Sequence, residues 1–186
     1  MSVIAPSATT QRSSLGLLDA RLYAFAAAFT AGNLLLPLAV HSVPRGGLIF
    51  LPILFFTLVA GYRFGFAAGA LTAVASPLLN HALTGMPPSQ ELATLLVQGL
   101  LIAAIAAILA VRTRLSPWPL LLAAASMQIA GFGMDVARGG SLAAGLDALR
   151  LGIPGVLIMG FGGYAVLRLM AAANVGRRPD GDAAPR

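Results

Sequence analysis

The chain has 186 residues, of which 58% are hydrophobic and only 10% charged, and its mean hydropathy is +0.87. A soluble globule of this composition would have too little polar surface to face water, so the sequence predicts an integral membrane protein. The chain has no cysteine, which excludes disulfides, thiolate metal sites and thiol nucleophiles.

Six apolar runs of about 17–21 residues match a hydrocarbon core about 30 Å thick, since a helix rises 1.5 Å per residue. They predict an all-α fold with one membrane domain of six transmembrane helices over residues 17–172. Residues 1–16 are polar and are expected to form a cytoplasmic tail. Residues 173–186 are expected to form a disordered basic tail on the same side.

The arginines divide unevenly between the two ends of these helices. Nine belong to the N-terminus, the second and fourth loops and the C-terminus, against Arg45, Arg138 and Arg150 on the opposite side. Because basic residues gather on the cytoplasmic side, both termini are predicted to be cytoplasmic, and the first, third and fifth loops face outward. The predicted location is the cytoplasmic (inner) membrane of a bacterium.

The first helix is expected over about Ala20–Val40, and small residues recur along it at a spacing of four. One row is Ala24, Ala28 and Gly32, and a second is Ala27 and Ala31. Such rows let another helix approach closely in lipid. They could pack within this chain or form a docking face for another subunit, and the sequence leaves both open.

Pro37 is expected to end or kink the first helix near the outside, and Asn33 lies one turn before it. A buried asparagine in lipid needs a hydrogen-bond partner. That partner could be a freed backbone carbonyl, which would make Asn33 structural, or it could be a ligand. The first outer loop follows and carries His41 and Arg45.

Two apolar runs, 47–61 and 66–79, are separated only by residues 62–65, so they are predicted to form an antiparallel helical pair. The second helix is expected to break at Ser76–Pro77 and lead into an outer loop that contains Asn80, His81 and Met86. The outer ends of the pair then lie together. This arrangement brings both histidines of the chain to one rim.

Three further helices complete the domain. The fourth is expected from an N-cap at Ser89 to Arg112, and the fifth begins at Pro117–Trp118. At its outer end Asp135 and Arg138 are close enough to pair. A short helix over 142–149 should place Asp147 and Arg150 on one side, and the sixth helix should cover about 151–170, with a glycine-rich turn at 160–163.

The sequence contains no P-loop, no nucleophile-elbow serine and no carboxylate in the middle of a helix. A self-contained pump or a membrane enzyme is therefore disfavoured. Three outer loops over proline-broken helices predict instead a cup that binds a small solute. The candidate substrate-binding residues are Asn33, His41, Arg45, Asn80, His81, Met86 and Asp135.

Residues 32–88, and above all GGLIFLPILFFTLVAGYRFGFAAGALTAVASPLLNHALTGMPP, resemble the substrate-binding membrane subunits (S-components) of energy-coupling factor vitamin transporters. The stretch is most similar to the cobalamin-type BtuM group. The resemblance implies high-affinity vitamin uptake, with cobalamin as the best candidate and as substrate rather than cofactor. It also implies that the Ala24/Ala28 row docks on a transmembrane coupling subunit driven by two ATPases, although some members of the group work alone.

Members of this group use a cysteine as cobalt ligand after the third helix, where this chain has Leu79-Asn80-His81. His81 or His41 is therefore the candidate axial ligand, since cobalt accepts imidazole. Three alternatives remain open: an S-component for another vitamin such as riboflavin, a non-catalytic structural protein of a cell-envelope assembly, and an intramembrane enzyme using both histidines with Asp135. None of these interpretations involves nucleic acid.

Overall fold

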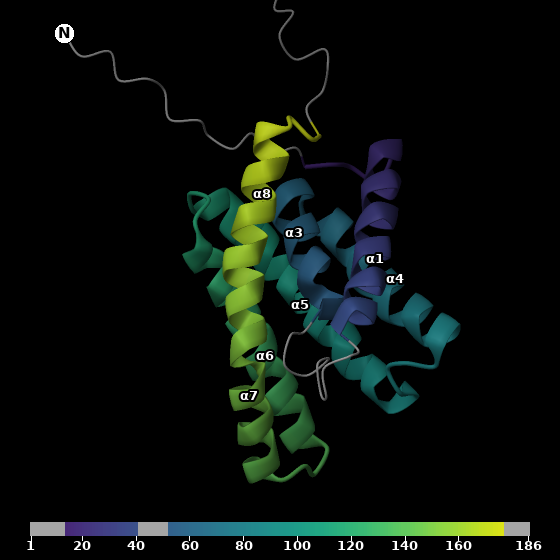
Figure 1. The fold of residues 1–186 in the computed structure, drawn as a ribbon, viewed down its shortest axis with the longest axis vertical. Helices are drawn as coiled ribbons and strands as arrows, with labels where there is room; N and C mark the ends of the chain where they lie inside the picture. The colour runs from purple at the N-terminus through teal and green to yellow at the C-terminus, as the bar shows by residue number, and fades with distance from the viewer. Residues whose placement is uncertain (1–13, 41–51, 177–186) are drawn as a thin grey trace, which may run out of the picture.

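The computed structural model describes residues 14–40 and 52–176, and within these ranges the elements are all helices, arranged as six rods (Figure 1). The rods, in chain order, are α1 (Ala20–Val40), the 3₁₀ turn η1 (Pro52–Leu54) leading into α3 (Phe55–Phe64), α4 (Phe66–Thr84), α5 (Ser89–Arg112), α6 (Pro117–Ala137), and α7 (Leu142–Leu157) continued by the π-helical η2 (Ile158–Gly162) and α8 (Gly163–Ala172).

Four rods among the described residues are long and apolar enough to cross a membrane: α4, α5, α6 and the continuous rod from α7 to α8. This finding agrees with the predicted all-α membrane protein. The predicted bounds of the first and fourth helices match α1 and α5.

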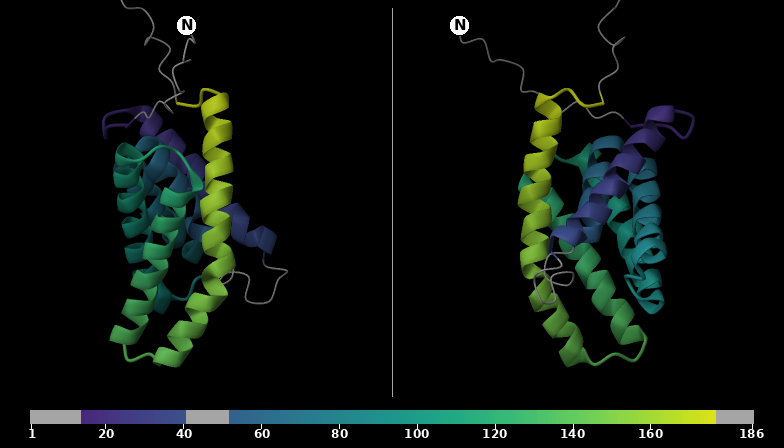
Figure 2. Two further views of the ribbon diagram at one scale, coloured as in Figure 1. Left: turned by 90° about the vertical axis from the view of Figure 1, so that its left-hand side faces the viewer. Right: turned by 45° about the vertical axis from the view of Figure 1, so that its right-hand side comes forward.

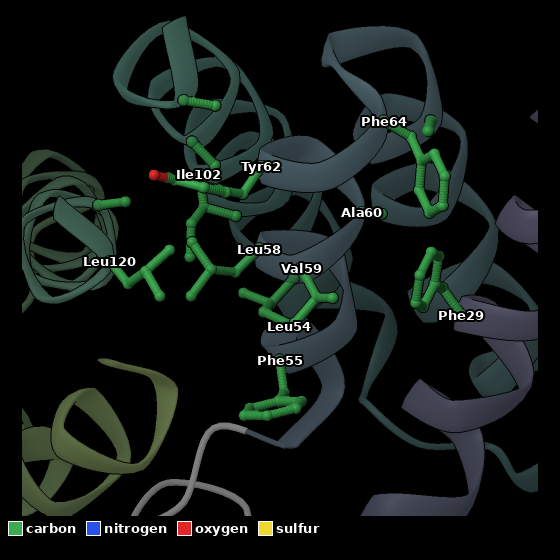
Figure 3. Close-up of a cluster of buried hydrophobic side chains, with 14 of the residues drawn as sticks. Phe29, Leu54, Phe55, Leu58, Val59, Ala60, Tyr62, Phe64, Ile102 and Leu120 are labelled. Atoms are coloured by element: carbon green, nitrogen blue, oxygen red, sulfur yellow. The ribbon is translucent and has the colours of Figure 1, made fainter. Parts of the chain in front are cut away.

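Helix α3 lies at the centre of the bundle and packs against α1, α4, α5 and α8. All of its residues except Phe56 are buried. Figure 3 shows Leu58 of α3 directed toward Ile102 and Leu120, which come from α5 and α6, while Phe64 lies with Phe29 of α1 on the opposite side. Burial on every side explains why this segment is mostly apolar, with Thr57, Tyr62 and Arg63 as its polar residues.

The antiparallel pair predicted around residues 62–65 is present as α3 and α4, but its turn is shorter than expected. Helix α3 continues through Tyr62 to Phe64, and Gly65 alone, at φ 89°, reverses the chain. Gly61 lies inside the helix and allows close packing. A Cβ on Gly61 would lie 2.9 Å from the carbonyl oxygen of Ala103, and a Cβ on Gly69 would lie 2.9 Å from Cα of Gly61. Glycines thus let α3, α4 and α5 meet backbone to backbone.

The break predicted at Ser76–Pro77 is wrong, because α4 continues through both residues to Thr84. The proline removes the backbone donor that would bond the carbonyl oxygen of Ala73, and the Ser76 hydroxyl donates to the preceding carbonyl oxygen, that of Thr72, at 2.7 Å. Pro77 is buried against the neighbouring helices, a setting in which membrane helices tolerate proline. Asn80 and His81 are therefore helical residues, and the helix ends at Gly85, whose φ is 71°.

Two predictions for the second half of the chain also need correction. Ser89 is the first residue of α5 and not its N-cap. The separate helices expected over 142–149 and 151–170 are one rod, in which the predicted glycine-rich turn is a π-helical segment, Ile158–Gly162. Gly160 in this segment leaves room for a side chain of α6, because a Cβ on it would lie 2.3 Å from Cδ2 of Leu121.

The start of α1, the end of α3 and the end of α8 lie at the same end of the bundle, which we call the Arg63 end (Figures 1 and 2). The backbone N–H of Leu15 donates to the carbonyl oxygen of Phe64, and Arg21 and Arg63 donate to the carbonyl oxygens of Gly176 and Val175. Leu15 is 6% exposed. Residues from Leu15 to Gly176 therefore take part in the packed structure.

The opposite end, which we call the His81 end, contains the α4–α5 turn and the α6–α7 hairpin. Figure 2 shows this hairpin extending beyond the other helices. Among the described residues, the Arg63 end has Arg21, Arg63, Arg112, Arg114 and Arg168 against Asp19, while the His81 end has Arg138 and Arg150 against Glu91, Asp135 and Asp147. The charge asymmetry predicted from the loop assignments is thus present in the fold.

Candidate functional site

Four polar residues recur at a spacing of four along α4: Thr72, Ser76, Asn80 and Thr84. We call this row the α4 polar row. Thr72 and Ser76 are fully buried and Asn80 is 9% exposed. Three of the side chains bond the carbonyl oxygen one turn earlier: Thr72 to Ala68, Ser76 to Thr72 and Thr84 to Asn80, at 2.7–2.9 Å. The row runs from the interior of the bundle to the His81 end.

Asn33 of α1 contacts the row at Ser76. Its amide nitrogen donates to Ser76 Oγ at 2.9 Å and to Thr57 Oγ1 at 3.1 Å, and its amide oxygen accepts the backbone N–H of Phe56 at 2.9 Å. The last contact satisfies a donor in the first turn of α3, a group that every helix start leaves without an intrahelical partner. Asn33 is fully buried, so it joins α1, α3 and α4 inside the bundle. The sequence left open a bond from Asn33 to a backbone carbonyl freed by Pro37, but the backbone group that Asn33 contacts is the N–H of Phe56.

Asn80 lies near the open end of the row. Its side-chain oxygen is 3.4 Å from Thr84 Oγ1, and its side-chain nitrogen makes no hydrogen bond with any described residue. An asparagine amide has two N–H donors. Asn80 is thus nine-tenths buried and keeps its donors for another group.

His81 follows directly and is half-buried. Its Nδ1 lies 2.7 Å from the carbonyl oxygen of Pro87, in the turn after α4. Because a carbonyl oxygen only accepts, Nδ1 must carry the proton, and Nε2 of the neutral ring then has a free lone pair. A bond from one ring nitrogen to a carbonyl oxygen is the arrangement that orients metal-binding histidines in proteins. Met86, 50% exposed, lies in the same turn.

The remaining predicted substrate-binding residues are placed differently. His41 and Arg45 lie outside the described residues. Asp135 is exposed in the last turn of α6, and α6 packs against α5, which in turn packs against α4. Asn80, His81 and Met86 are therefore close in the chain and in the fold, Asn33 lies deeper on the α4 polar row, and Asp135 is on another part of the same end.

The predicted pairing of Asp135 with Arg138 is absent, because Arg138 donates to Thr94 Oγ1 of α5 instead. Asp147 and Arg150 do pair, at 3.5 Å, and both side chains are more than 70% exposed. A surface pair of this kind contributes little stability. Gln98 is a further polar residue inside the bundle, 8% exposed and packed against Gly131 of α6.

The small residues of α1 separate into two groups. Ala24, Ala27, Ala28 and Ala31 are exposed, whereas Gly32 faces the ring of Phe56, whose Cδ2 would lie 2.6 Å from an added Cβ. Gly32 thus packs within this chain. The four alanines form a face that no helix of the described bundle covers, and we call it the α1 alanine face.

The α4 polar row was missed at the sequence level, although its spacing of four is visible in T-A-V-A-S-P-L-L-N-H-A-L-T. The assumed break at Pro77 hid it by assigning its second half to a loop. Among the described residues, no group of three or more histidines and carboxylates is positioned to hold a metal ion.

The fold and this row define an all-helical protein with membrane-length helices and a polar line leading to one end. No protein-family model, curated protein or solved structure matches the chain.

Proposed function

We propose that the chain is a membrane-embedded vitamin-binding subunit of the energy-coupling factor type, and that its substrate is cobalamin or a related corrinoid. The observation that carries the proposal is the pair formed by Asn80 and His81 at the end of α4. One residue offers N–H donors that no described group uses, and the next offers an imidazole nitrogen with a free lone pair.

The two groups suit a corrinoid because its periphery carries amide groups and its cobalt accepts an axial imidazole. The bond from Nδ1 of His81 to Pro87 supports this use, since it holds the ring with Nε2 available. The residues therefore fit the ligand in donor type. Binding would need no reaction by the protein, in keeping with the absence of catalytic motifs in the sequence.

The proposal includes a docking function for the α1 alanine face. In lipid, helices associate through close packing of small side chains, and this face carries four alanines exposed on one helix. A transmembrane coupling subunit driven by ATPases is the expected partner, unless the protein works alone. Exchange of Ala28 for Trp should then weaken assembly with that subunit without changing vitamin binding.

The deciding experiment is a titration of the purified full-length protein with cobinamide, a corrinoid that lacks its own nucleotide base, followed by visible absorbance. Coordination of His81 Nε2 to cobalt should shift the corrinoid spectrum. His81→Ala should abolish the shift, and Asn80→Leu should weaken binding by about tenfold, the effect of losing roughly one hydrogen bond of 1.4 kcal/mol. Gln90→Ala, an exposed position at the same end, is the matched control.

Failure of cobinamide and cobalamin to bind would refute the corrinoid assignment. A thermal-shift screen that instead detected riboflavin or another vitamin would retain the transporter class and change the substrate. If every vitamin left the melting temperature unchanged, the vitamin-binding proposal would be wrong.

A further inference from the structure

The Arg63 end carries arginines in two different states. Arg21 and Arg63 donate hydrogen bonds to the carbonyl oxygens of Gly176 and Val175, in the turn at residues 173–176 that we call the C-terminal turn. Arg112, in the last turn of α5, and Arg114, in the turn that follows, are exposed and make no hydrogen bond or ion pair with any described residue. Two positive charges, separated by one residue, thus have no counter-charge among the described residues.

An exposed tryptophan follows four residues after Arg114. Trp118 is the second residue of α6 and is 73% exposed. Tryptophan is enriched at membrane interfaces, where its ring meets acyl chains and its N–H meets polar headgroups. Its position next to Arg112 and Arg114 suggests that this turn lies at headgroup depth.

Helix α8 adds a third arginine at the same level. A Cβ on Gly163 would lie 3.6 Å from Cδ1 of Leu120, so these two residues are opposite each other on α8 and α6. From this level toward the Arg63 end, Pro117 lies about 4.5 Å further along α6, and Arg168 lies about 7.5 Å further along α8, at 1.5 Å per residue. Arg168 is therefore close in height to the start of α6, where Trp118 lies. Arg168 is exposed, lies over the ring of Tyr164, 5.9 Å from its centroid, and donates a hydrogen bond of 3.4 Å to the hydroxyl of the same residue.

We propose that Arg112, Arg114, Trp118 and Arg168 form a binding surface for the phosphate headgroup of an anionic phospholipid. The partner follows from charge complementarity and from placement, because exposed guanidinium groups with no acidic partner among the described residues occur together with an exposed indole at the end of membrane-length helices. Arginines near an anionic leaflet each favour association by an amount equivalent to about fivefold in affinity. The His81 end lacks this combination among the described residues, since the single tryptophan of the chain is Trp118 and Arg150 pairs with Asp147.

The test uses the full-length protein in neutral detergent and native mass spectrometry with added phosphatidylglycerol or phosphatidylcholine. The wild type should retain phosphatidylglycerol in preference to phosphatidylcholine. Arg112→Gln and Arg114→Gln should each weaken phosphatidylglycerol retention about fivefold, and the variant that also changes Arg168 should lose the preference. Arg150→Gln removes the same charge at the opposite end and should leave retention unchanged.

Equal retention of the two lipids by the wild type would overturn the proposal. So would an Arg150→Gln variant as weak as Arg112→Gln, because the effect would then reflect net charge and not this surface. Displacement of the lipid by inorganic phosphate at low concentration would also overturn it, by showing a site for free phosphate. Because vitamin binding is measured separately, the result is independent of the proposed transport function.

Discussion

Replacement of Asn33 by leucine tests whether hydrogen bonds or apolar packing hold α1, α3 and α4 together. Leucine has a similar size, so the change removes the polar contacts with little loss of volume. Asn33 is fully buried and bonds Thr57, Ser76 and the backbone N–H of Phe56. The variant loses all three bonds and leaves the Phe56 N–H without its partner on α1.

The expected cost follows from these contacts. Hydrogen bonds between side chains in membrane proteins contribute about 0.6 kcal/mol each, and a buried donor left unsatisfied costs about 1–3 kcal/mol. Asn33→Leu should therefore lower the free energy of unfolding by about 2–4 kcal/mol. Reversible unfolding in mixed micelles of neutral detergent and sodium dodecyl sulfate, followed by circular dichroism, would measure it.

Thr30 is the matched control on the same helix. It is 4% exposed, and its hydroxyl makes no hydrogen bond with any described residue. Thr30→Val exchanges an unsatisfied hydroxyl for a methyl of the same shape, so the free energy of unfolding should stay level or rise. If Asn33→Leu were as stable as the wild type, or if Thr30→Val cost as much, the hydrogen bonds of Asn33 would not be what stabilises this part of the bundle.

Three further predictions concern packing, turn geometry and the C-terminal turn. Gly69→Ala should destabilise the protein by about 1–3 kcal/mol in thermal unfolding, because the added Cβ would lie 2.7 Å from Cβ of Ala103. Gly133→Ala is the control: its added Cβ has nothing within 4 Å, so the variant should be neutral or slightly more stable. Gly65→Ala should cost about 1 kcal/mol or more in the same assay, since φ at this turn is 89°; an unchanged melting temperature would contradict that conformation. Arg21→Gln should speed trypsin cleavage after Arg177 about tenfold by removing a charged hydrogen bond of about 1.5 kcal/mol to Gly176, and Arg168→Gln should leave that rate unchanged.

The helix limits that were predicted correctly are those marked by residues close to them in the sequence. Helix α5 starts after two prolines and ends at an arginine, and α1 follows a polar segment, so both were placed correctly. Proline and glycine misled the prediction where tertiary contacts decide the outcome. Pro77 lies inside α4, buried against its neighbours, and Gly61 lies inside α3, where the backbone of Ala103 leaves no room for a Cβ.

The candidate site was predictable in part. Asn80, His81 and Met86 are near in sequence, and the structure keeps them at one end of α4. The partners of Asn33 could not be predicted, since Thr57 and Ser76 come from helices whose rotation only the packed fold defines. The bond from His81 to Pro87, which determines which ring nitrogen is free, also depends on the conformation of the turn.

The rod from Leu142 to Ala172 has 31 residues and is therefore about 46 Å long at 1.5 Å per residue. A hydrocarbon slab of about 30 Å cannot contain it at the usual inclinations of up to about 40°. Part of the rod must therefore lie outside the hydrocarbon core, and the Asp147–Arg150 pair, each more than 70% exposed, marks that part. The tip of the α6–α7 hairpin is thus a helical projection outside the hydrocarbon core, which an antibody fragment could bind for electron cryomicroscopy of this 19.0 kDa protein.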